Sequence, residues 1–330
     1  MTLGNHDFNY GYQRLLELKD MSMVGMISAN VLKDGKTLFD PYVIKEIGGV
    51  KIGIFGLATP ETAYKTSPAN VEGITFADSI EISKKMVEEL DEQTDVIIGL
   101  VHIGLDESSV ITSKAIAENV EGIDILIDGH SHTVLENGML VNDTLIAQTG
   151  NYGQALGYID IEVKDGEVVS KTAKLLPAAN TADVVPDPDV EKKLAEIEAE
   201  NEAEFSKIVT KTDVYLDGVR ENVRTKETNL GNLSADAARA ATGADIAFVN
   251  GGGIREDIQI GDITKGKVAA IFPFGNTIQV KKITGKDLLA MLEVSVSGYP
   301  AANGAFLQVS GLTFAFDPAK EAGAKVSDVM

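Results

Sequence analysis

The chain contains no cysteine. Disulfide bonds, thiolate zinc sites and cysteine nucleophiles are therefore excluded as sources of stability or chemistry. This absence fits both a cytosolic protein and an exported bacterial protein, so it does not identify a cellular compartment.

Basic residues are scarce, because 29 lysines and arginines stand against 50 acidic residues and give a net charge of −21. Such a surface repels nucleic acid and anionic membranes, so neither is expected as a partner. No apolar run approaches the ~18 residues that a membrane span requires, and no signal peptide is recognisable. A phosphate ligand would have to be neutralised locally, by a metal or by a few arginines.

The first half of the chain alternates apolar runs with amphipathic stretches, and 44% hydrophobic residues over 330 positions allow a sizeable core. Helical spacing of apolar residues predicts a helix over 76–93, and a later segment, 155–176, predicts a hairpin. Alternation of strand and helix predicts an α/β domain. Three apolar runs predict its buried strands: 50–58, 95–104 and 123–132.

Residues 186–208 change character, because two prolines are followed by an Ala-, Glu- and Lys-rich helical pattern. Two interpretations stand: a solvated surface helix, or a linker helix between two domains. The linker is favoured because composition and motifs restart after it, with helices expected over 227–242 and 283–297 and a strand entering a glycine loop over 244–255. The predicted domains are 1–187 and 208–330, joined by a linker helix over 188–207.

The chain has only four histidines, and each follows or ends a predicted strand or lies in a turn of the same kind: His6, His102, His130 and His132. In open α/β sheets this edge is where ligands bind. A single buried histidine is more often structural, but four in such places predict a metal centre. Neutral imidazole suits zinc and similar metals, and Asn or Asp oxygens add harder ligands.

Three motifs resemble successive motifs of the calcineurin-like metallophosphoesterases: GNHDFNYG near the start, VHIGLD at 101–106 and DGHSHT at 128–133. Two later stretches, 227–255 with its NGGGIR end and IFPFGN at 271–276, resemble the substrate domain of 5'-nucleotidases, including the UDP-sugar hydrolase branch. The resemblance implies an α/β fold: a metallophosphoesterase β-sandwich flanked by helices, with its N-terminal strands missing, a linker helix, and a second α/β substrate-binding domain.

The resemblance also implies two divalent metal ions, zinc, manganese or similar. Asn5, His102 and His130 match ligands of one ion, and His132 matches a ligand of the other. His6 matches the catalytic histidine that stabilises charge on the phosphoryl group. Asn9 stands where the family commonly has an aspartate that orients this histidine; an amide can hydrogen-bond the ring but supplies no charge.

Six residues of the second half match positions that bind the nucleotide. Their guanidinium, amide and aromatic groups suit a phosphate or carboxylate and a base. Without the resemblance, Phe274 beside Pro273 would be core material, and the first two arginines would lie on an exposed strand or turn. The six are Arg220, Arg224, Asn250 and Arg255 for gripping substrate, Phe274 for stacking on the base and Asn276 for a polar contact to it.

In the resembled family, an Asp-x-His and a Gly-Asp motif precede the first motif found here. Neither is present, so we expect Met1 to be an internal methionine, both ends to be cut and the second metal site to be incomplete. The chain alone is then expected to be nearly inactive on AMP even with added Mn²⁺ or Zn²⁺. An extracellular, cell-wall or periplasmic location is expected for the full-length protein, as in most relatives.

The leading function is hydrolysis of a nucleoside 5'-monophosphate to nucleoside and phosphate, in nucleotide catabolism. Within the hydrolases, the alternatives are a 2',3'-cyclic-nucleotide 2'-phosphodiesterase/3'-nucleotidase and a UDP-sugar diphosphatase. Asn9 favours the cyclic branch, and the NGGGIR loop favours the 5'-nucleotidases. An alternative of another class is a non-catalytic nucleotide-binding module.

Overall fold

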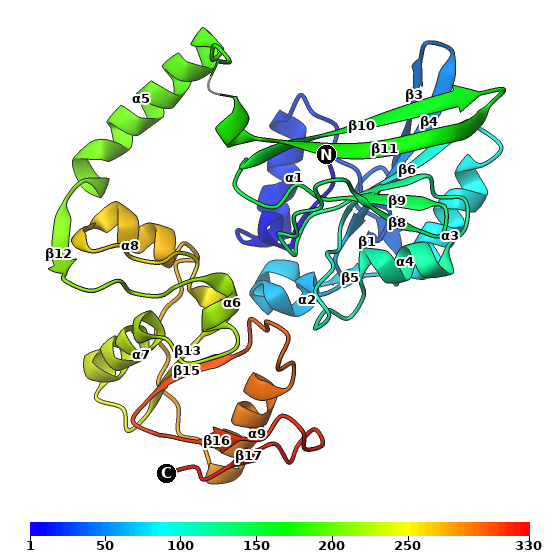
Figure 1. The fold of residues 1–330 in the computed structure, drawn as a ribbon. Coiled ribbons are helices and arrows are strands. Elements are labelled where there is room, and N and C mark those ends of the chain that lie inside the picture. Colours follow the sequence, from blue (N-terminus) through cyan, green and yellow to red (C-terminus); the bar gives the residue numbers. More distant parts are fainter. Residues whose placement is uncertain (182) are drawn as a thin grey trace. The chain divides into compact units, whose positions relative to one another are not determined.

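The computed structural model describes residues 1–181 and 183–330. These residues form two compact units, Met1–Val184 and Val185–Met330, whose elements are labelled in Figure 1. The helix expected over 188–207 falls inside the second unit. Both units mix helices and strands, as the sequence predicts.

The first unit alternates helices and strands. Its helices are α1 Tyr12–Met21, α2 Thr62–Lys65, α3 Ser79–Leu90 and α4 Ser113–Asn119, with 3₁₀ turns η1 Asn5–Phe8, η2 Pro68–Val71 and η3 Ala178–Asn180. Its strands are β1 Val31–Lys33, β2 Lys36–Thr37, β3 Tyr42–Ile47, β4 Val50–Ala58, β5 Ile74–Phe76, β6 Val96–His102, β7 Ile125–Ile127, β8 Met139–Val141, β9 Thr144–Ala147, β10 Ala155–Lys164 and β11 Glu167–Pro177.

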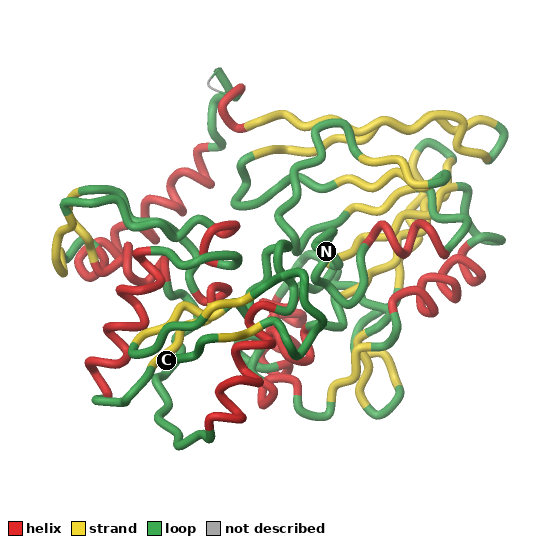
Figure 2. Tube along the Cα trace, turned by 60° about the horizontal axis from the view of Figure 1, so that its bottom comes forward, coloured by secondary structure: helices red, strands yellow, loops and turns green. Residues whose placement is uncertain are grey.

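A mixed sheet forms the centre of this unit, in the order β3-β4-β6-β7-β9-β8. Strands β4, β6, β7 and β9 are parallel, and the two edge strands are antiparallel to their neighbours. A small antiparallel sheet, β2-β1-β5, and the long hairpin β10–β11 complete the strands. Figure 2 shows the hairpin as two long neighbouring strands. The parallel order matters for function, because it puts the carboxyl ends of β4, β6 and β7 at one edge.

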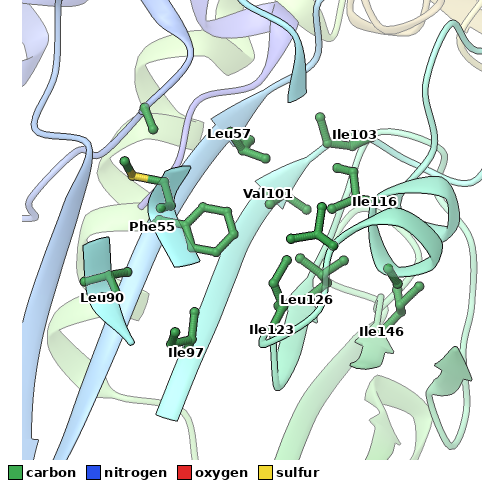
Figure 3. Packing of buried hydrophobic residues seen from close by; sticks show 14 residues of the cluster. Phe55, Leu57, Leu90, Ile97, Val101, Ile103, Ile116, Ile123, Leu126 and Ile146 are labelled. Atoms are coloured by element: carbon green, nitrogen blue, oxygen red, sulfur yellow. The ribbon is translucent and has the colours of Figure 1, made fainter. Parts of the chain in front are cut away.

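The main core lies between the central sheet and the helices α3 and α4 (Figure 3). Gly99 on β6 makes close packing possible, because a Cβ there would lie 2.5 Å from Leu126 Cδ2 and 2.9 Å from the Phe55 ring. Burial of such side chains is the main favourable term in folding. The core residues labelled in Figure 3 are Phe55, Leu57, Leu90, Ile97, Val101, Ile103, Ile116, Ile123, Leu126 and Ile146.

The helix expected over 76–93 begins later than expected, at Ser79. Asp78 caps it by accepting a hydrogen bond from the backbone N–H of Glu81 at 2.9 Å. Phe76 instead belongs to β5 and packs edge-to-face on Phe8, with ring centroids 5.5 Å apart. The helical assignment of Phe76 is wrong because this aromatic contact, remote in sequence, outweighs the local periodicity.

The second unit also combines helices with paired strands. Its helices are α5 Pro188–Phe205, α6 Arg220–Val223, α7 Asn229–Thr242, α8 Lys265–Ile271 and α9 Gly285–Val296, with the 3₁₀ turn η4 Gly251–Gly253. Its strands form three antiparallel pairs: β12 Ile208–Thr212 with β14 Gly261–Thr264, β13 Ala247–Asn250 with β15 Leu307–Ser310, and β16 Ala315–Phe316 with β17 Val326–Ser327.

Helix α5 is confirmed, and Asp187 caps it by accepting from the backbone N–H groups of Asp189 and Val190. All of its residues are exposed, which agrees with its polar composition. Among the residues that the structure describes, no helix has both the length and the apolar character to cross a membrane.

Gln308 on β15 organises the second unit from inside. Its side chain is buried, and its amide nitrogen donates to the carbonyl oxygens of Val223 at 3.0 Å and Lys226 at 2.8 Å. Its amide oxygen accepts from the backbone N–H of Thr228 at 3.1 Å. These bonds satisfy the backbone between α6 and α7, where otherwise unpaired polar groups would be costly. The segment that carries Arg220 and Arg224 is thereby fixed to the strand pair.

Candidate functional site

The carboxyl edge of the central sheet carries three polar segments. Strand β6 ends at His102, β7 is followed by the turn 128–133, and β4 is followed by 59–65. The parallel pairing of β4 with β6 places Ala58 opposite His102, so these segments meet at one edge. The 3₁₀ turn η1 brings Asn5 and His6 to the same place.

Asn5, His102 and His130 converge here. Asn5 Oδ1 lies 3.2 Å from His102 Nε2 and 3.1 Å from His130 Nδ1, and the two ring nitrogens are 3.3 Å apart. Asn5 is buried, and Gly4 makes room for the ring of His102, since a Cβ at Gly4 would lie 3.0 Å from Nε2. Asn5 is 97 positions from His102 and 125 from His130 in the chain. The three side chains nevertheless bring atoms that can ligate a metal to one place.

Burial, together with the weaker effect of the neighbouring groups, lowers the pKa of His102 to about 3; those neighbours are His130, His6, His132 and Lys65. His102 is therefore neutral at physiological pH, with a lone pair on one ring nitrogen. Neutral imidazole is the form that binds metal ions.

The turn 128–133 is strained. His130 and His132 have φ angles of 72° and 60°, in the left-handed region that residues with a Cβ rarely adopt. Such a conformation costs free energy and persists only where neighbouring contacts hold it. Ser131 and Thr133 provide such contacts, because the Ser131 hydroxyl and the Thr133 backbone N–H donate to the side-chain oxygen of Gln148 at 3.0 Å and 2.6 Å.

Asp128 ties this turn to the end of β6. Its half-buried carboxylate accepts from the backbone N–H groups of Ile103 at 2.9 Å, Gly104 at 3.0 Å and Gly129 at 2.7 Å, and from the hydroxyl of Ser113. Burial raises the pKa of Asp128, while these donors act in the opposite direction. The loops that follow His102 and precede His130 therefore share one anchor.

Glu61, which no motif in the sequence predicts, supports the site from the end of β4. Its buried carboxylate lies 3.3 Å from His130 Nε2, 2.7 Å from Lys65 Nζ and 2.8 Å from the Tyr64 hydroxyl. Burial raises the pKa of Glu61, but the bonds from His130, Lys65 and Tyr64 outweigh burial and hold the pKa at about 2. Its one signal in the sequence is its place, directly after a strand that ends at this edge.

The other two histidines each have an asparagine beside them. The amide nitrogen of Asn9 lies 3.2 Å from His6 Nδ1, so the expected His6–Asn9 pair is present. His132 Nδ1 lies 3.2 Å from the amide nitrogen of Asn151, and its ring packs on Tyr152.

Within the described ranges, no group of three or more His, Asp or Glu side chains is arranged to hold a metal. The convergence of expected ligands that the structure does show is the trio of Asn5, His102 and His130.

In the second unit, Arg255 and Phe274 form a pair, with the guanidinium carbon 5.5 Å from the ring centroid. A guanidinium Nη1 also donates to the carbonyl of Gly252 at 3.4 Å, which folds Arg255 back over the glycine turn η4. Asn250 begins the same turn, and its amide nitrogen donates to the carbonyl of Gly304 at 3.1 Å. Three of the expected substrate residues thus lie around η4.

Arg224 lies against the same glycine turn. A Cβ at Gly251 would come within 2.0 Å of the Val223 carbonyl oxygen, so only glycine allows this approach. Arg220 belongs to α6, with Nη1 3.6 Å from Glu221, and Arg224 follows that helix. Of the alternative of an exposed strand or turn, the strand is wrong: Arg220 begins α6, Arg224 lies in the turn after it, and both are half-buried rather than exposed. Asn276 is exposed, two residues after Phe274.

Comparison with known proteins matches the two parts of the chain to two different families. Residues 1–134 match the family described as calcineurin-like phosphoesterase, and residues 208–330 match the 5'-nucleotidase C-terminal domain. The chain is similar to the 5'-nucleotidase precursor of Thermus thermophilus, with a TM-score of 0.88 and 33% identity, covering 100% of this chain and 68% of that one.

Two curated relatives are also similar. The trifunctional nucleotide phosphoesterase protein YfkN of Bacillus subtilis is 38% identical over 88% of this chain and 20% of its own length. The 5'-nucleotidase of Vibrio cholerae is 30% identical over 100% of this chain and 66% of its own length. The chain therefore spans only part of the length of these relatives.

Fold and matches together define a calcineurin-like phosphoesterase unit followed by a 5'-nucleotidase C-terminal domain, a class that uses divalent metal ions. Within that class, the chain belongs to the 5'-nucleotidase family.

Replacing Asp128 by asparagine should destabilise the first unit by about 2 kcal/mol or more, because an NH₂ group in place of Oδ2 would face the Ser113 hydroxyl and the Gln148 side-chain amide nitrogen, which donate to Oδ2 in Asp128. Urea unfolding of the variant, with the exposed Asp143→Asn as matched control, measures the loss. An Asp128→Asn midpoint equal to that of the control would contradict the anchoring role.

Proposed function

We propose that this protein hydrolyses the phosphate ester of a nucleotide, with a nucleoside 5'-monophosphate and water giving a nucleoside and phosphate. The observation that carries the proposal is the convergence of Asn5, His102 and His130 at the carboxyl edge of the sheet. Membership of the 5'-nucleotidase family supports the substrate class.

The three residues fit a divalent ion. Ligand atoms about 2.0–2.2 Å from a tetrahedral ion stand about 3.3–3.6 Å apart, close to the 3.1–3.3 Å found here. The neutral ring of His102 can offer a lone pair to an ion. The Glu61 carboxylate beside His130 Nε2 can accept a hydrogen bond from that nitrogen, which leaves the lone pair of His130 on Nδ1, toward Asn5. When bound, such ions polarise a phosphoryl group and activate a water. We propose two ions, with His132 a ligand of the second.

The chain's own residues would do the rest. Asn5, His102 and His130 orient the site, and His6 stabilises charge that develops on the phosphoryl oxygens. In the second unit, Arg255, Arg224 and Arg220 would grip anionic or polar groups of the substrate. Phe274 would stack on the base, and Asn250 and Asn276 would add polar contacts.

Removal of one ligand tests the metal site. His102→Ala should weaken binding of Mn²⁺ or Zn²⁺ at least about 100-fold, because one of the three donor atoms is lost. Isothermal titration calorimetry measures the affinity directly. His6→Gln is the matched control, since it should keep the affinity while losing phosphate release. Unchanged affinity in His102→Ala would refute the ligand assignment.

Removal of the Phe274 ring tests base recognition. In a version extended to the length of the relatives, Phe274→Ala should raise the KM for AMP about tenfold or more, because base–aromatic stacking contributes about 1–3 kcal/mol. The KM for p-nitrophenyl phosphate, which has no base, should stay constant. Phe272→Ala, an exposed phenylalanine two residues earlier, is the control variant. A KM for AMP that does not change would remove Phe274 from the site.

A substrate panel separates the alternatives. Because the chain alone is expected to be nearly inactive, the panel uses a version extended to the length of the relatives; phosphate release from AMP with Mn²⁺, lost on chelation with EDTA, is expected of that version. Preferential cleavage of a 2',3'-cyclic nucleotide would favour the cyclic branch, for which Asn9 speaks. Preferential cleavage of a UDP-sugar would favour the diphosphatase. Binding of metal and nucleotide without release of phosphate from any of them would instead support a non-catalytic nucleotide-binding module.

A further inference from the structure

A chain of polar groups leads from Asn70 in the 3₁₀ turn η2, through Thr66 and Asn9, to the ring of His6. Asn70 Nδ2 lies 2.8 Å from the backbone oxygen of Asn9 and 3.3 Å from Thr66 Oγ1. Thr66 Oγ1 lies 3.4 Å from Asn9 Oδ1, and Asn9 Nδ2 lies 3.2 Å from His6 Nδ1. The hydroxyl-bearing residue, Thr66, is buried.

The direction of this chain follows from which groups can donate. A backbone oxygen only accepts, so Asn70 must place its NH₂ group toward Asn9. The same NH₂ group donates to Thr66 Oγ1, which leaves the hydroxyl hydrogen of Thr66 for Asn9 Oδ1. The amide of Asn9 is thereby oriented with its oxygen toward Thr66 and its NH₂ group toward His6.

We propose that Thr66 and Asn70 are positioning residues that, through Asn9, hold His6 in the tautomer with its proton on Nε2. Nδ1 then accepts from the amide of Asn9, because an N–H at Nδ1 would face another N–H. The catalytic consequence of this tautomer rests on the proposed function; the tautomer itself does not.

The consequence concerns what a neutral His6 can do. An aspartate in place of Asn9 would accept from Nδ1–H, and a neutral ring would then present a lone pair at Nε2. With Asn9, the neutral ring presents an N–H there instead, and can donate a hydrogen bond to a phosphoryl oxygen without carrying charge. An aspartate would stabilise His6 by its negative charge, whereas Asn9 stabilises the neutral tautomer with the proton on Nε2.

Nitrogen-15 NMR of histidine-labelled, zinc-loaded protein tests the tautomer directly. With four histidines in the chain, the His6 signals are those lost in His6→Gln. At neutral pH, Nδ1 of His6 should give the shift of an unprotonated ring nitrogen and Nε2 that of an N–H. In Asn9→Asp, Nδ1 should become protonated. A wild-type protein with Nδ1 protonated would overturn the proposal, whatever the variants do.

Thr66→Val keeps the shape of the side chain but removes the hydroxyl. The amide of Asn9 is then free to turn, so His6 should show averaged shifts from both tautomers. In a version extended to the length of the relatives, kcat should fall about tenfold with little change in KM. Thr66→Ser retains the hydroxyl and should keep both wild-type properties. Wild-type His6 shifts in folded Thr66→Val would overturn the positioning role. A wild-type protein, extended to the length of the relatives, that releases no phosphate would overturn the proposed function, while the shifts still decide the tautomer.

Discussion

The half-buried carboxylate of Asp128 links two loops that a parallel sheet brings near each other but does not join. Strands β6 and β7 run side by side, so their ends share an edge, yet the backbone N–H groups after each strand lie beyond the last paired residues of the two strands. Asp128 accepts from Ile103, Gly104 and Gly129 together. This bond set fixes His102 relative to His130, and the spacing of their ring nitrogens depends on it.

Around this anchor, each histidine is controlled by the polar group beside its ring. Glu61 and Lys65 flank His130 Nε2, Asn9 faces His6 Nδ1, and Asn151 faces His132 Nδ1. A ring nitrogen is a donor or an acceptor according to such neighbours. These partners therefore determine which nitrogen of each imidazole can donate a hydrogen bond and which can accept one or bind a metal.

The convergence of His102 and His130 could be predicted from sequence because its signal is local: histidines placed at the ends of apolar runs, where parallel strands direct them to one edge. His102 and His130 follow this rule. Glu61, Thr66 and Asn70 do not, since their value lies in contacts with His130 and Asn9 that span 57 or more positions. Phe76 shows the same limit for the fold, because its packing on Phe8 decided between strand and helix.

The contact between Gly231 and Gln308 limits which substitutions these two positions can accept. A Cβ at Gly231 would lie 2.1 Å from the Gln308 amide oxygen, and that amide cannot move away without breaking bonds to Val223, Lys226 and Thr228. A methyl group at this position of α7 would thus require a shorter residue on β15 and new partners for three backbone groups. Over evolutionary time, the two positions should vary jointly or stay as they are.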